Sequence, residues 1–129
     1  MKNNSRVYFS DCRATRDNET LYRKIGRLFD AARFDGRINK GDLVALKLHW
    51  GLPGNQRRVR PEHVRAVVEK VKKAGGHPYV LETTGVGLSG LRGNGARYLE
   101  AAYRNGFTYD VLHAPVVLGD GVKGFSGVR

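Results

Sequence analysis

Residues 43–48 are the feature that most limits how this chain can fold. The run Leu43-Val-Ala-Leu-Lys-Leu48 is apolar at odd and even positions alike, with Lys47 the exception. A strand with apolar side chains on both faces is typical of a parallel sheet that helices cover. A helical pattern begins at Pro61, and a second short apolar run follows at residues 78–82. The order strand, helix, strand predicts a βαβ unit, which makes the two strands parallel.

Three stretches have helical periodicity. The first is predicted to begin after Asn18, whose side chain can cap a helix, and to end near Phe34. The second begins at Pro61, because a missing N–H costs nothing in the first turn, and it ends before Gly75. The third covers residues 96–104. The apolar stripe of the second helix is predicted to consist of Val64, Val67, Val68 and Val71.

Other apolar runs predict further strands at residues 6–10, 109–114 and 116–118. We therefore predict a single α/β domain over residues 1–129: a small three-layer domain with a four- to five-stranded, mainly parallel sheet and three helices. Residues 119–129 are predicted to be loop or a truncated continuation. A sheet of this size leaves open edges. We expect the chain to pair with another copy, as a homodimer, or with a second chain that completes the sheet.

Composition narrows the class of protein. A chain of 129 residues, of which 40% are hydrophobic, has enough apolar material for one core. It contains no run that could span a membrane and no signal-peptide pattern, so we expect a cytoplasmic protein. Cys12 is the only cysteine, so this chain alone cannot ligate an iron–sulfur cluster. The formal net charge of +11 favours anionic partners, nucleic acid among them.

The candidate site follows from where strands end. In parallel sheets, ligands bind at the carboxyl ends of the strands. Lys47 and His49 end one predicted strand, and Glu82 ends the next. Imidazole titrates near neutral pH, so His49 is a candidate acid or base. Glu82 is a second candidate catalytic group, with a structural ion pair to Lys47 as its alternative role.

Two loops supply candidate ligand-binding residues. The loop before Pro61 is basic and contains Asn55 and Arg57, close to a helix N-terminus that favours anions. Residues 85–95 are glycine-rich and contain Arg92 and Asn94. Residues 85–90 also fit the G-x-G-x-x-G spacing of a dinucleotide site, but the predicted helix begins too late for that motif. We prefer an anion-binding or lid loop.

No metal site is predicted. The chain has four histidines, and those outside the candidate site, His63, His77 and His113, lack metal-ligand spacing. Asp120 lies between two glycines and is predicted to be a turn residue, and Trp50 is predicted to belong to the core.

Several stretches resemble the domain-of-unknown-function family 362, which is often described as iron–sulfur associated. They are Lys47-Leu-His-Trp-Gly-Leu-Pro-Gly-Asn55 with Arg60-Pro61, Gly90-Leu-Arg-Gly-Asn94 with Leu99-Glu100, Asn105-Gly-Phe-Thr108 and Ala114-Pro-Val-Val-Leu-Gly-Asp-Gly-Val-Lys-Gly124. The resemblance runs in order from about Val7 to Gly124. It implies that a full-length relative couples this region to a ferredoxin-type 4Fe-4S module.

The chain departs from the family pattern in length and at two positions. Relatives are longer, and this chain lacks their cysteine motifs. Relatives also tend to have an acid where this chain has Leu52 and a histidine where it has Tyr98. Both are groups that could ligate a metal or move a proton. The sequence therefore leaves open whether this chain is an enzyme.

The sequence supports three hypotheses about function. The first is a small anionic ligand bound at the carboxyl edge, with a 4Fe-4S-linked redox partner or missing module. In it Lys47, Arg57 and Arg92 hold negative charge, and His49 and Glu82 orient hydroxyls or transfer a proton. Asn55 and Asn94 fix the loop and the ligand through amide hydrogen bonds. The second is a small basic nucleic-acid-binding protein, and the third is a non-catalytic structural subunit.

Overall fold

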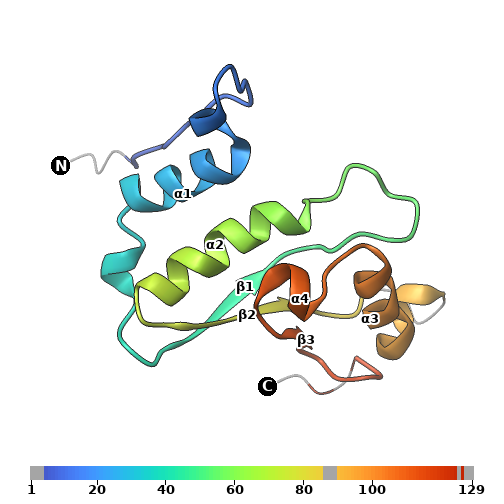
Figure 1. The fold of residues 1–129 in the computed structure, drawn as a ribbon. Helices are drawn as coiled ribbons and strands as arrows, with labels where there is room; N and C mark the ends of the chain where they lie inside the picture. The colour runs from blue at the N-terminus through green and yellow to red at the C-terminus, as the bar shows by residue number, and fades with distance from the viewer. Residues whose placement is uncertain (1–4, 86–89, 125, 127–129) are drawn as a thin grey trace.

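A computed structural model of the chain describes residues 5–85, 90–124 and 126. Its regular elements are, in order, α1 (Leu21–Ala31), β1 (Leu43–Lys47), α2 (Pro61–Lys73), β2 (His77–Glu82), α3 (Gly95–Arg104), α4 (Tyr109–Leu112) and β3 (Val116–Leu118). Single 3-10 turns lie at Asp17–Glu19, Asp35–Arg37 and Leu91–Gly93. Strands alternate with helices as Figure 1 shows, so the predicted α/β class is confirmed.

The sheet is parallel throughout, in the order β1-β2-β3. Ala45 of β1 pairs with Tyr79 of β2, and Leu81 of β2 pairs with Val117 of β3. The predicted βαβ unit is confirmed, and α2 begins at Pro61 as expected. The described residues form three strands, so the prediction of four to five was wrong.

The helices after β1 pack together on one face of the sheet. Because the strands are added in one direction and crossovers are right-handed, consecutive connections lie on the same side. One hydrophobic cluster accordingly joins all of these elements: Val64 and Val68 of α2, Val80 of β2, Tyr98, Ala101 and Ala102 of α3, Leu112 of α4, and the loop residues Trp50, Phe107 and Ala114. This cluster packs near the carboxyl ends of β1 and β2, through Trp50 after β1 and Val80 of β2.

The opposite face of the sheet has no described helix over it. Burial alternates along β1, where Val44 and Leu46 are half-buried while Leu43 is 78% exposed and Ala45 is exposed. The prediction that residues 43–48 are buried on both faces was therefore wrong. A three-layer arrangement with the sheet covered on both sides is not found among the described residues. The apolar composition of a strand does not show whether helices cover one face of the sheet or both.

The predicted first strand, residues 6–10, is not a strand. Val7 is 88% exposed and Phe9 is 86% exposed, and the segment belongs to no sheet. Its β-type composition predicts a strand only if a neighbouring strand is available to pair with it, because β-propensity depends on context.

The predicted strand at residues 109–114 was also wrong, since residues 109–112 form the single helical turn α4. Leu112 and Ala114 are both fully buried, and buried residues two positions apart are also the pattern of a β-strand. The turn ends at His113, whose φ of 57° reverses the chain into β3. The alternative fifth strand at residues 116–118 exists, and it is β3.

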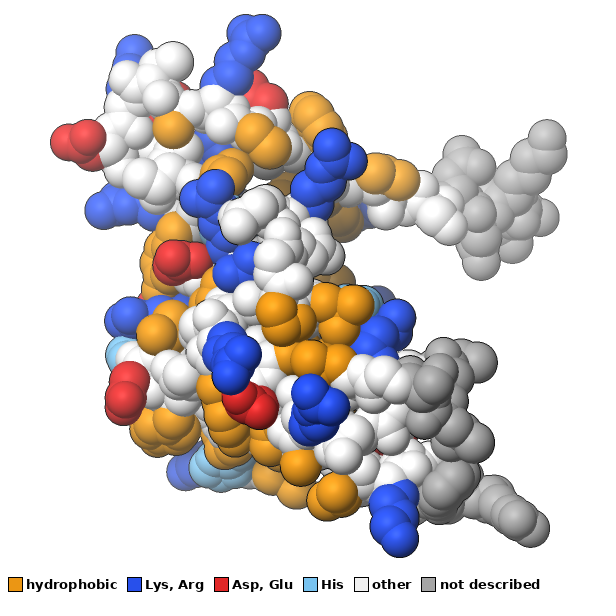
Figure 2. All heavy atoms as spheres, turned by 90° about the vertical axis from the view of Figure 1, so that its right-hand side faces the viewer, with side chains coloured by type: hydrophobic (Ala, Val, Ile, Leu, Met, Phe, Trp, Pro, Cys, Tyr) orange, Lys and Arg blue, Asp and Glu red, His pale blue; other side chains and the backbone are white. Residues whose placement is uncertain are grey.

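Helix α1 lies outside α2, on the β1 side of the sheet (Figure 1). Its cap is Thr20, whose hydroxyl accepts the Arg23 N–H at 3.4 Å, and the prediction of Asn18 as cap was wrong. Two polar pairs tie α1 to α2, namely Tyr22 with Glu69 and Asp30 with Lys70. Figure 2 shows the molecule narrowing between the upper lobe with α1 and the lower body with the sheet.

Candidate functional site

The ends of β1 and β2 meet at one edge of the sheet, as the sequence predicted. The Leu48 N–H donates to Leu81 O at 3.2 Å, which holds the two strand ends in register. Beside this bond, Lys47 Nζ pairs with Glu82 Oε1, so the structural ion pair considered for Glu82 is present. The Glu82 side chain is only 6% exposed, while that of Lys47 is 54% exposed. The Thr83 N–H donates to the same carboxylate at 2.9 Å.

His49 lies two residues beyond Lys47 and is exposed. Its Nδ1 accepts the Gly51 N–H at 2.8 Å, so in the neutral ring Nε2 carries the proton. Gly51 has a φ of +79°, and a Cβ there would lie 2.8 Å from the Arg58 side chain, so glycine is required for this turn. The turn fixes the imidazole at the edge of the sheet.

Tyr98 lies near Trp50, His49 and Arg92, and it was not among the ligand-binding residues predicted from the sequence. It reaches the edge from α3 and is fully buried. Its ring lies 5.0 Å from that of Trp50 and 6.4 Å from that of His49, and Arg92 Cζ lies 6.0 Å from the Tyr98 ring centre. The i, i+3, i+4 spacing of Tyr98, Ala101 and Ala102 was the available signal that this tyrosine faces the core.

Burial raises the pKa of the Tyr98 hydroxyl above its ordinary value of 10.0, and the negative charge of Glu82 raises it further. Arg92 opposes this rise in pKa through its positive charge and through its closeness to the hydroxyl oxygen. The hydroxyl nevertheless has no hydrogen-bond partner of acceptable geometry among the described residues. Tyr98 therefore remains a neutral donor over the physiological pH range.

Four buried side-chain donors lack acceptors within the described ranges. One is Arg58 Nε, and the other three are the Tyr98 hydroxyl, Trp50 Nε1 and Arg92 Nε. An unpaired buried donor typically costs about 1–3 kcal/mol, so native structures contain few of them. The three donors other than Arg58 Nε belong to side chains that lie at or beside the ring of Tyr98.

The loop that carries Arg92 is held tightly against the end of β2. The Gly85 N–H donates to Arg92 O at 3.1 Å, and a Cβ on Gly85 would lie 2.5 Å from Arg92 Nε. Residues 86–89, with most of the G-x-G-x-x-G spacing, lie outside the described residues.

Asp120 has a larger structural role than the turn predicted for it. Its two carboxylate oxygens each accept the Thr84 N–H at 3.0 Å, and it also accepts the Thr84 hydroxyl. The residue thus ties the loop after β3 to the end of β2. Nothing in its local sequence indicated this partner, because the contact spans the whole second crossover.

The remaining candidates have local structural contacts. The Asn55 side chain accepts the Arg57 N–H at 2.9 Å, and both residues are exposed. The Asn94 side chain caps α3 by accepting the Arg97 N–H at 3.2 Å. Among the described residues, no hydrogen bond or ion pair connects these three side chains to Lys47, His49 or Glu82.

Metal-ligating side chains are not clustered in the described residues. No group of three histidine, cysteine, aspartate or glutamate side chains gathers in these parts of the chain. The single cysteine, Cys12, is exposed and lies far before the site in the sequence. An iron–sulfur cluster therefore finds no ligand set here. None of the helices in the described ranges combines the length and apolar composition that crossing a bilayer requires.

Comparison with protein families supports the resemblance found in the sequence. The model of the domain of unknown function DUF362 matches residues 44–126, from β1 to beyond β3. The chain belongs to the DUF362 family. The DUF362 match includes every residue of the candidate site. It begins after α1, so the segment from Val7 to residue 43, where a resemblance to the family was also noted, lies outside the match. No curated protein and no solved structure matches the chain.

Proposed function

We propose that this DUF362 chain binds a small anionic ligand at the carboxyl edge of its sheet, between the ends of β1 and β2 and the loop with Arg92. The observation that supports the proposal is the set of three buried donors without acceptors, Trp50 Nε1, the Tyr98 hydroxyl and Arg92 Nε. A phosphate or carboxylate offers several oxygen acceptors together, and hydrogen bonds to a charged acceptor are the stronger kind.

The charges at the edge suit such a ligand. Arg92 is basic, and the formal charge of the chain is +11, so the edge favours an anion even though Lys47 is already paired with Glu82. Glu82 does not prevent anion binding, because Lys47 and the Thr83 N–H already compensate its charge. His49 is exposed and fixed through Nδ1, so Nε2 is available to orient a hydroxyl or to transfer a proton. Asn55 and Arg57 are proposed as additional contacts from the loop before α2.

The test uses Tyr98→Phe, which removes one hydroxyl and almost no volume. Without ligand, the variant should be as stable as the wild type or more stable by about 1 kcal/mol, because an unpaired buried donor is lost. Its affinity for inorganic phosphate, measured by calorimetry or NMR titration, should fall about tenfold, the equivalent of about 1.4 kcal/mol. Stability and affinity should thus change in opposite directions.

The matched control is Tyr103→Phe on the same helix, where the tyrosine is 49% exposed. It should alter neither quantity. His49→Ala should also abolish phosphate binding without unfolding the chain. Unchanged phosphate affinity in Tyr98→Phe would contradict the proposal.

Nucleic-acid binding is the alternative proposal, and the net charge of +11 is what favours it. Affinity for RNA or DNA would then fall steeply with salt, because binding releases counterions from the phosphates. It would also be insensitive to Tyr98→Phe, since the Tyr98 hydroxyl is buried away from a long polyanion. Absence of nucleic-acid binding at low salt would exclude this alternative.

A further inference from the structure

The outer edge of β1 is unpaired within the described part of the chain, where β1 pairs only with β2. Asp42 O accepts the His77 N–H at 2.7 Å, and the Leu48 N–H donates to Leu81 O at 3.2 Å. In a parallel ladder, alternate residues bond to the same neighbour, so the even-numbered residues face β2. Leu43, Ala45 and Lys47 therefore direct their backbone groups to the open edge.

An apolar groove of about 630 Å³ lies along this edge, between α1, α2 and β1. Its walls include Ile25, Leu28 and Phe29 of α1, Val67 of α2, and Val44 and Leu46 of β1. A second hollow of about 400 Å³ shares Ile25, Leu46 and Val67 with it and continues towards Lys47. An unpaired strand beside an apolar groove is the surface that an added β-strand uses.

The chain itself contains a segment that fits such an edge. Residues 6–10 contain three consecutive apolar or aromatic residues, Val7, Tyr8 and Phe9, between Arg6 and Ser10, and their length equals the five residues of β1. Val7 and Phe9 are among the most exposed large hydrophobic residues of the molecule, at 88% and 86%. Tyr8, between them, lines the groove beside β1. Apolar side chains exposed to this extent, next to an unfilled apolar groove, indicate that the segment docks.

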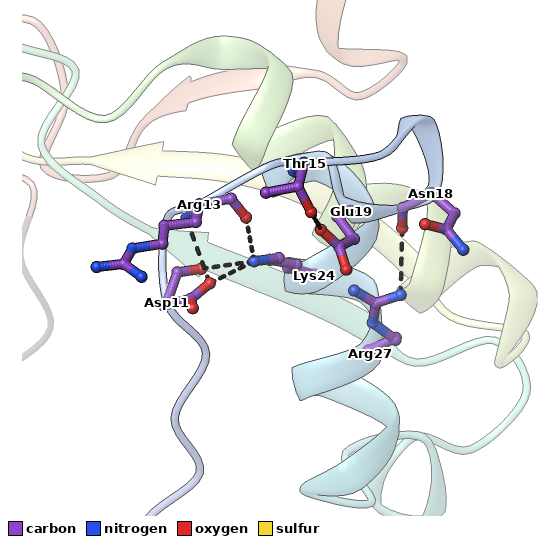
Figure 3. Close-up of polar contacts among 7 residues, drawn as sticks. All are labelled: Asp11, Arg13, Thr15, Asn18, Glu19, Lys24 and Arg27. Carbon is purple, nitrogen blue, oxygen red and sulfur yellow. Dashed lines mark hydrogen bonds and ion pairs between the residues drawn. The ribbon is translucent and has the colours of Figure 1, made fainter.

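Polar contacts with Lys24 of α1 hold the residues that directly follow this segment, Asp11 to Arg13 (Figure 3). Lys24 is buried, with 7% exposure, and its Nζ donates to Asp11 O at 3.1 Å, to the Asp11 carboxylate at 2.5 Å and to Arg13 O. A buried ammonium group is costly unless it is hydrogen-bonded, so these contacts hold Lys24 and residues 11–13 together. The chain immediately after Ser10 is thus fixed, while Val7 and Phe9 face outward and the β1 edge of the same chain stays open.

We propose that two copies of this chain exchange residues 6–10, each segment adding a parallel or antiparallel strand to the open edge of β1 in the other copy. The exchange is reciprocal, so the dimer has a two-fold axis and both segments find a partner at once. It buries Val7 and Phe9 and pairs the backbone groups of Leu43, Ala45 and Lys47. The exchanged segment precedes the part of the chain that the DUF362 model matches, residues 44–126.

Charge gives this dimer a distinctive dependence on salt. Each copy has a formal charge of +11, so two copies repel each other, and added salt screens the repulsion. The dimer should therefore become tighter as salt is raised. Binding of phosphate or nucleic acid should become weaker under the same change, so the two kinds of association can be told apart.

The experiment measures molar mass by size-exclusion chromatography with light scattering, over a wide range of protein concentration and at low and high salt. Phe9→Asp should weaken dimerisation about tenfold or more, because a buried phenyl ring is replaced by a charge. The residue is 86% exposed in the single chain, so the substitution leaves the fold intact. Ala45→Pro removes one N–H from the open edge and should also give a monomer.

Tyr109→Asp is the matched control, since it makes the same change at another exposed aromatic residue, 63% exposed, in the first turn of α4. This variant should dimerise like the wild type. Hydrogen exchange provides the second measurement: the amides of Leu43, Ala45 and Lys47 should be protected in the wild type and exchange quickly in Phe9→Asp.

Three results would overturn the proposal. The first is a wild-type monomer at every salt and concentration. The second is a monomer in which these three amides are protected, which would mean that residues 6–10 close on their own β1. The third is a dimer that survives both Phe9→Asp and Ala45→Pro, which would assign the interface to another surface, such as the uncovered face of the sheet.

Discussion

At the scale of single residues, Glu82 shows how the site balances burial against charge. Its carboxylate is almost completely covered, yet it has a charged partner in Lys47 and a backbone donor in Thr83. A buried ion pair adds little net stability, but removing one partner leaves a charge that is costly to bury. Lys47 is predicted to hold the negative charge of a ligand, and in this structure it is paired with Glu82, the alternative that the sequence left open.

Lys47→Met should therefore lower the free energy of unfolding by about 2 kcal/mol. This value lies between the ~0–1 kcal/mol of an exposed pair and the ~3–5 kcal/mol of a fully buried one, because Lys47 itself is half-exposed. Glu82→Gln in the same background should recover most of the loss, since the charge is removed with its partner. Urea denaturation of the two single variants and the double variant measures the coupling. Equal losses with no coupling would show that Glu82 does not depend on Lys47.

At the scale of elements, a helix cap and a loop-to-loop contact explain two residues that a sequence pattern assigns to ligand binding or to turns. Asn94 is the N-cap of α3, and Asp120 anchors the loop after β3 to Thr84. Because α3 carries Tyr98, the cap also sets where the tyrosine enters the site. Predicting α3 itself was straightforward, since Asn94 precedes a helical pattern that ends before Gly106.

Asn94→Ala should lower the free energy of unfolding by about 1 kcal/mol, the usual cost of losing an N-cap. Asn94→Ser should restore most of that stability, because a serine hydroxyl accepts the same N–H. If Asn94 also contacts the ligand with its amide, then phosphate affinity should fall in both variants. A serine variant with wild-type stability and wild-type affinity would restrict Asn94 to capping.

At the scale of the whole molecule, α1 is joined to the rest through the side of α2 rather than through the sheet. The junction contains polar pairs, among them Tyr22 with Glu69, beside the apolar groove that reaches β1. Glu69 is also paired with Arg65 at 3.0 Å. A junction of this kind should respond to pH, because a carboxylate is one of its main acceptors.

The hydrogen bond from Tyr22 lowers the pKa of Glu69 below its ordinary value of 4.5, with Arg65 contributing in the same direction. A group with a lowered pKa in the folded state stabilises the fold above 4.5, and that contribution is lost as the pH falls through the lower, folded-state pKa. Glu69→Gln keeps an acceptor for Tyr22 and should show a smaller loss of stability on acidification. Urea denaturation at a series of acidic pH values tests this, and identical pH profiles would contradict it.

Local spacing was sufficient to predict the βαβ unit, the start of α2 and the possible pairing of Lys47 with Glu82 at one edge. These features depend on periodicity, on Pro61 and on the rule that parallel strands end together, all of which are local or topological. Long-range contacts decided the rest. Residues 6–10 have the composition of a strand but lack a neighbour, and residues 109–112 form a turn of helix because Leu112 and Ala114 must reach the core.

The same distinction applies to the site. A strand-end position brings Lys47 and Glu82 together wherever the chain forms this sheet, so both could be found from the order of residues. Tyr98, Trp50 and Arg92 come from three different segments, and only the packing of α3 on the sheet places their donors in one neighbourhood. A donor becomes costly only when packing removes both water and every acceptor from it. The tertiary structure decides which donors are in that situation, and the sequence does not show it.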